Sequence, residues 1–134
     1  MLGRFRPLPT TEQIETIARA TMERLPDQFR EHLGNVVLQV EDFADAETLA
    51  AVGLTNPHQL SGIYQGIPLD RKSISHSGAM PDRIRLFRIP ILQEWRARGD
   101  VSLEFMVAHV LIHEVGHHFG LSDETIDWLE EQAE

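Results

Sequence analysis

The sequence contains no cysteine, so it can form neither a disulfide framework nor a thiolate metal site. It also lacks long apolar runs: the longest apolar patch, residues 105–112, is interrupted by His109 and is far shorter than a membrane span. The N-terminal residues 1–7 hold two arginines with no apolar stretch behind them, unlike a secretory signal peptide. These absences predict a cytoplasmic protein with no membrane partner.

Basic residues are scarce, with 12 Lys and Arg against 21 Asp and Glu and a net charge of −9. This balance makes nucleic acid or anionic lipid an unsuitable partner for the surface as a whole. The charge is uneven, because residues 83–98 are rich in arginine and residues 123–134 are acidic. Two solvated surfaces are the simpler interpretation, and a basic rim beside a substrate groove is the alternative.

The 134 residues show no internal repeat and no long linker, which predicts one domain spanning residues 1–134, expected to be a monomer. Helices at both ends of a few strands indicate an α+β fold. The first helix is expected from Thr10, where Gln13 completes a capping box, to a break at Pro26. Further helices are expected at 45–52, 90–98 (with Pro90 first), 102–119 and 122–132, and strands at 36–40, 62–67, 73–75 and 83–86.

Two details of this pattern concern packing. Arg83-Ile84-Arg85-Leu86 alternates between polar and apolar residues, which predicts a half-exposed strand. Trp95 and Trp128 occupy helical positions and are interpreted as core residues.

The chemistry of the chain is concentrated in His113-Glu114-Val115-Gly116-His117. Histidines four residues apart lie one turn apart on one face of a helix, where both imidazoles can reach one metal ion. Glu114 lies beside them and can face the same side without being a ligand. This H-E-x-x-H arrangement is typical of zinc peptidases, in which the glutamate is the general base.

A third protein ligand is needed if one metal position is to stay open for water. Gly120 is expected to end the helix, since glycine accepts the left-handed conformation that reverses the chain. Asp123 follows three residues later and can return to the metal. The full pattern is H-E-x-x-H-x-x-G-x-x-D, with His113, His117 and Asp123 as ligands.

This pattern resembles the zincins with an extended motif, in the variant that ends in aspartate. Together with Gly62–Leu69 and Pro81–Ile84, the chain resembles the minimal bacterial zincin-like metallopeptidases. The resemblance implies a single small domain, a mixed sheet of three to four strands and a central active-site helix. It also implies zinc held by His113, His117 and Asp123, with Glu114 as base. No methionine follows Met106, so the methionine turn of the metzincins is absent.

Other residues near this motif have two interpretations each. His109 lies one turn before His113, but a fourth histidine would close the open position, which favours a core or supporting role. His118 is rotated off the ligand face. Tyr64 and His76 could stabilise an oxyanion, although a packed tyrosine and a surface histidine are the simpler interpretation.

The sequence therefore predicts zinc-dependent hydrolysis of peptide bonds, with zinc activating a water and Glu114 accepting its proton. By resemblance, the substrate would lie extended beside the 62–67 strand. Two alternatives remain open: a non-catalytic, zinc-stabilised module that binds a partner, and a hydrolase of non-peptide amides.

Overall fold

The structure, a computed structural model, describes residues 7–66 and 81–133. Helices and strands together confirm the expected α+β class, and their order along the chain is α1 (Thr11–Glu23), α2 (Asp27–Arg30), β1 (Val37–Glu41), α3 (Ala46–Ala51), the 3₁₀ turn η2 (Pro57–Gln59), β2 (Gly62–Gln65), β3 (Arg83–Phe87), α4 (Arg88–Arg98), α5 (Leu103–Phe119) and α6 (Asp123–Ala133). The expected strand at 73–75 and His76 lie outside the described residues.

The three described strands form a mixed sheet in the order β1-β3-β2. β1 runs parallel to β3, whereas β2 is antiparallel to it. Ile84 on the central strand β3 lies opposite Leu38 on β1 and opposite Tyr64 on β2. In the described part of the sheet β2 is an edge strand.

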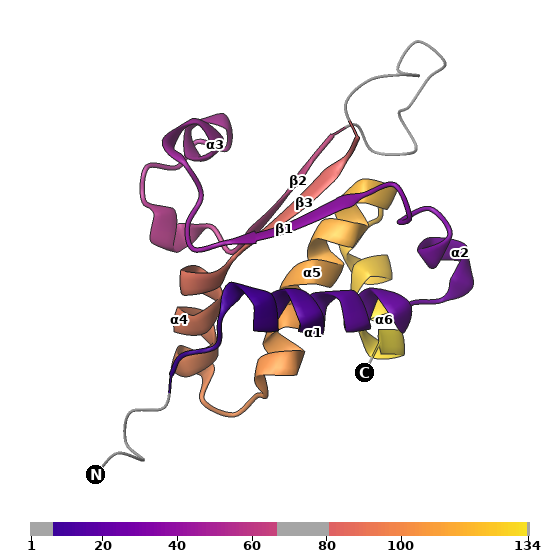
Figure 1. The fold of residues 1–134 in the computed structure, drawn as a ribbon. Helices are drawn as coiled ribbons and strands as arrows, with labels where there is room; N and C mark the ends of the chain where they lie inside the picture. The colour runs from indigo at the N-terminus through magenta and orange to yellow at the C-terminus, as the bar shows by residue number, and fades with distance from the viewer. Residues whose placement is uncertain (1–6, 67–80, 134) are drawn as a thin grey trace.

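One face of the sheet is covered by α1 and α5, with α6 packed against the far side of α5 (Figure 1). Because side chains alternate along a strand, residues in register with Ile84 point to this face. They join the apolar core, whose fully buried members on strands and helices include Ile14, Ile84, Leu86, Met106, Leu111 and Leu129. The helix α5, which carries the H-E-x-x-H motif, is therefore central, as the sequence predicted. No helix within residues 7–66 or 81–133 is long and apolar enough to cross a membrane.

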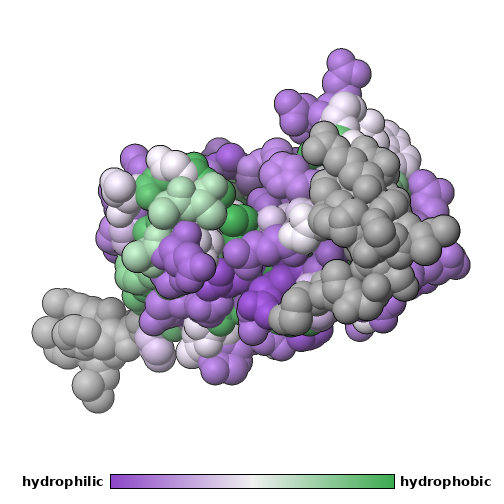
Figure 2. Space-filling model, turned by 90° about the horizontal axis from the view of Figure 1, so that it is seen from above, coloured by the Kyte–Doolittle hydropathy of each residue, from purple (hydrophilic) through white to green (hydrophobic). Residues whose placement is uncertain are grey.

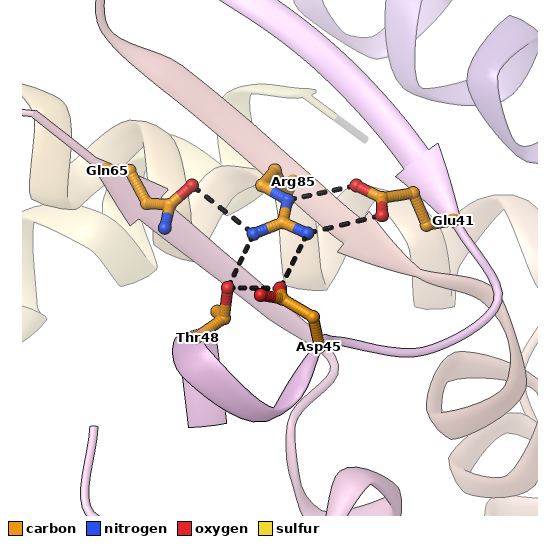
Figure 3. A network of polar contacts seen from close by, with 5 residues as sticks. All are labelled: Glu41, Asp45, Thr48, Gln65 and Arg85. Carbon is orange, nitrogen blue, oxygen red and sulfur yellow. Dashed lines mark hydrogen bonds and ion pairs between the residues drawn. The ribbon is translucent and has the colours of Figure 1, made fainter. Parts of the chain in front are cut away.

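The opposite face of the sheet buries an arginine. Arg85 is only 8% exposed, so the prediction of a half-exposed strand is wrong for this side chain. Its guanidinium donates to Glu41 Oε1 at 2.9 Å, to Thr48 Oγ1 at 2.8 Å and to Asp45 Oδ1 at 3.2 Å (Figure 3). The acidic partners lie about 40 positions away in sequence, so local alternation could not reveal them.

Seen from the side of α3, this face is hydrophilic over its middle, with apolar residues at the α3 end (Figure 2). Phe43 and Val52, which flank α3, are 36% and 44% exposed. This face thus combines the polar groups around Arg85 with a smaller buried apolar cluster of Ala44, Leu49 and Phe87, whereas the main core lies on the other face.

Local signals set most helix boundaries. Thr10 and Gln13 form the expected capping box, and Gly99 ends α4 in the left-handed conformation (φ 74°). Pro90 was expected at the first position of α4 but lies at the third, still within the first turn, where its missing N–H has no helical acceptor. Trp95 packs against the core as expected, whereas Trp128 is 44% exposed and is not a core residue.

Candidate metal centre

The candidate metal centre lies on α5. Ser102 caps this helix by accepting a hydrogen bond from the Phe105 amide at 3.0 Å. His109, His113 and His117 follow at four-residue spacing and form one stripe, as helical geometry requires. Their exposed fraction rises along the stripe, from 27% through 38% to 57% of the side chain. The sequence therefore placed the motif histidines correctly on an accessible face of a buried helix.

Glu114 lies beside this stripe and is itself buried. Its Oε1 is 3.2 Å from Nδ1 of His117. This hydrogen bond is the main reason that the pKa of His117 is raised, and the negative charges of Glu114 and Asp123 add to it while burial opposes it. The expected base is thus in contact with one expected ligand.

The turn after α5 brings Asp123 back toward the histidines. Gly120 adopts the left-handed conformation (φ 67°, ψ 32°) that the sequence predicted. The Leu121 amide donates to the Gly116 carbonyl at 2.9 Å, which closes the helix end. Asp123 then opens α6, exposed and near enough for its charge to raise the pKa of His117.

A second group of ligand-type side chains shares His113. Among the described residues, one atom each from His109, His113 and Glu130 lie within 4.8 Å of one another, a closeness that His113, His117 and Asp123 do not reach. Nδ1 of His109 contacts Glu130 Oε1, and Nε2 of His113 lies 4.0 Å from Glu130 Oε2. The sequence assigned His109 a supporting role and did not single out Glu130, because the register of α6 on α5 is a tertiary property.

His118 points away from the stripe, as predicted, into a buried polar cluster. Its Nδ1 lies 3.2 Å from Oδ2 of Asp82, which also accepts a hydrogen bond of 2.8 Å from the Tyr64 hydroxyl. Burial, and then Asp82, raise the pKa of Tyr64 well above its ordinary value. The packed interpretation of Tyr64 is therefore the one that fits, and the cluster joins α5 to β2 and to the start of β3.

The motif glycine Gly116 has a packing role that the sequence analysis did not find. A Cβ at this position would lie 2.4 Å from both Cδ1 and Cγ1 of Ile126 on α6. Only glycine allows α6 to approach α5 this closely, and that approach positions both Asp123 and Glu130. An isolated glycine inside a strongly apolar helix was the available signal.

A cavity of about 190 Å³ lies between α5, α4 and the edge strand. It is bounded by residues of the loop before β2, of β2 itself, of α4 and of α5, namely Ser61, Gly62, Glu94, His109, Val110, His113 and Glu114. The space therefore connects the buried Glu114 carboxylate with the edge of β2, where an extended chain could lie.

The motif residues suit a zinc ion chemically. Two imidazoles and one carboxylate match the donor types of zinc sites with three protein ligands and one open position. His117 and Asp123 are exposed and His113 is half-exposed, so their side chains have room to turn toward a common ion. The raised pKa of His117 follows from its hydrogen bond to Glu114 and from the negative charges of Glu114 and Asp123.

The comparisons with known proteins agree with this geometry. Residues 33–133 match the family described as zincin-like metallopeptidase. The match includes all three strands, the motif helix and α6, and covers most of the chain, so the chain belongs to this family. No curated protein matches it.

Proposed function

We propose that the chain is a zinc-dependent peptidase whose metal is held by His113, His117 and Asp123. The observation that carries the proposal is the position of Glu114, a buried carboxylate in contact with a motif histidine and open to a cavity beside an edge strand. When bound, zinc polarises a carbonyl and lowers the pKa of a coordinated water to about 7.

The protein's own residues supply the rest of the chemistry. Glu114 accepts a proton from the attacking water and delivers it to the leaving amine, as a general base and then a general acid. The edge of β2 offers backbone groups to an extended peptide, so the scissile bond lies across the cavity in front of Glu114. A peptide substrate is favoured over another amide because an edge strand forms hydrogen bonds with a continuous peptide backbone.

The test compares wild type, Glu114→Gln and Glu104→Gln on one mixed peptide library, with zinc content measured in each. Glu104 is an exposed glutamate in the first turn of the same helix and serves as the control. We expect Glu114→Gln to retain zinc and to lose about 10²–10⁴-fold in hydrolysis, while Glu104→Gln behaves like wild type.

Three other outcomes would contradict the proposal. Zinc retained in a wild type without hydrolytic activity would support a metal-stabilised binding module instead. Activity on non-peptide amides alone would support the other alternative. Activity that survives unchanged in Glu114→Gln would belong to another site.

A further inference from the structure

The group formed by His109, His113 and Glu130 has no part in the function proposed above, apart from His113. We propose that these three residues form a second divalent-cation site that competes with the motif site for His113. Two imidazoles and a carboxylate are again the donor set, and zinc or another first-row divalent ion is the ligand class that it suits.

The geometry of the group favours a built site over a chance surface pair. His109 and His113 have ring centroids 4.7 Å apart, one above the other along α5. Glu130 approaches from α6 with one carboxylate oxygen toward each ring. All three side chains are partly buried at the α5–α6 interface, so an ion there would be shielded from bulk water more than at a surface pair.

Space for additional water ligands is present on both sides of the group. A cavity of about 200 Å³ borders His109 and Glu130 on the side of α1 and α6. The 190 Å³ cavity beside β2 borders His109 and His113 on the other side. An ion held by three protein atoms could therefore complete its coordination with water.

The competition follows from the shared histidine. Nε2 of His113 lies on the Glu130 side in this structure, and one nitrogen binds one ion at a time. An ion held with Glu130 would leave His117 and Asp123 as the only motif ligands. The second site would therefore draw the metal away from the ligand set proposed for hydrolysis.

The experiment isolates the second site by removing the first. In the double variant His117→Ala/Asp123→Asn, which keeps His113, Zn²⁺ is titrated by calorimetry and Co²⁺ by its visible absorption. We expect one equivalent of either ion to bind. Adding Glu130→Gln or His109→Gln to this background should weaken the dissociation constant by about 10-fold or more, as for lost metal-site partners.

Glu131→Gln in the same background is the control, because Glu131 is an exposed glutamate on α6 next to Glu130. It should leave the dissociation constant unchanged. The proposal is overturned if the double variant, shown to be folded by circular dichroism, binds neither ion. It is equally overturned if Glu130→Gln and His109→Gln weaken binding no more than Glu131→Gln. Because no activity is measured, neither result depends on whether the motif site hydrolyses peptides.

Discussion

The two faces of the sheet differ in what they bury, although the same strands build both: one holds the main apolar core, and the other combines the ion pairs of Arg85 with a smaller apolar cluster around Phe87. Ile84 and Leu86 of β3 point into the apolar core beneath α1 and α5, and both are fully buried. Arg85, between them, points to the other face and is held by carboxylates of β1 and of the start of α3 (Figure 3).

This difference shows how the chain supports its candidate metal centre. The apolar face of the sheet packs against one side of α5. The histidine stripe lies on a part of that helix outside this packed core. The other face is closed by ion pairs and by the smaller apolar cluster around Phe87. The acidic partners of Arg85 are largely exposed: 43% of the Glu41 side chain and 55% of the Asp45 side chain. Stability should therefore depend more on the first face than on the second.

The largest effect is expected from Ile84→Ala. Ile84 has no exposed surface and contacts the core from the central strand. Removing its outer carbons loses apolar burial and leaves a cavity, so we expect a loss of about 2–5 kcal/mol in the free energy of unfolding. Urea denaturation of the metal-free protein, with an unchanged m-value, measures it.

Arg85→Ala is the matched comparison on the other face. Its carboxylate partners can be hydrated when the guanidinium is removed, so the expected loss is smaller, about 1–3 kcal/mol. If Arg85→Ala destabilised the protein more than Ile84→Ala, the ion-paired face would be the main source of stability and the comparison would be wrong.

A smaller effect is expected where α6 meets the apolar side of α5. Gly116→Ala should favour the helix by about 1 kcal/mol. The new methyl group, however, would overlap Ile126, and overpacking costs about 1–3 kcal/mol. We therefore expect a net loss of up to about 2 kcal/mol, measured by urea denaturation.

The matched background for this substitution is Ile126→Ala, which removes both atoms that the new methyl group would meet. There, Gly116→Ala should be neutral or stabilising, which gives a favourable coupling between the two sites in a double-mutant cycle. Simple additivity of the two losses would show that Gly116 does not set the distance between α5 and α6.

The motif helix could be predicted from the sequence because its signals are local. A start near Ser102, Gly120 as the stop and the placing of the histidines on one face are all read within one helix, and each is confirmed. Family membership, shown by the match over residues 33–133, agrees with the resemblance drawn from the motif. The ligand set of His113, His117 and Asp123 stays a prediction.

The remaining features depend on contacts between distant segments. Glu130 reaches His109 only through the register of α6 on α5, 21 positions away in sequence. Asp82 reaches His118 only through the position of β3 beside that helix. The alternating pattern makes Arg85 look exposed. Its burial depends on Glu41 and Asp45, which lie about 40 residues earlier in the sequence. Periodicity carries no information about such pairings.

The smallest effect on the metal-free protein is expected from His117→Ala, at the exposed end of the stripe. The side chain is 57% exposed and hydrogen-bonds Glu114, and a partly exposed pair of this kind contributes about 1 kcal/mol or less to the free energy of unfolding. In a Glu130→Gln background, which removes the second proposed site, the same substitution should abolish most of the stabilisation by zinc. Before His117 is replaced, zinc at 100 times its dissociation constant should add about 2.7 kcal/mol, because it binds only the folded chain. Hydrogen exchange locates the effect: in the Glu130→Gln background zinc should slow exchange across Gly120–Leu129, the segment that carries Asp123, and much less once His117→Ala is added. If exchange across this segment is equally slow with zinc and with a chelator, the metal does not stabilise α6. Asp123 would then be removed from the proposed ligand set.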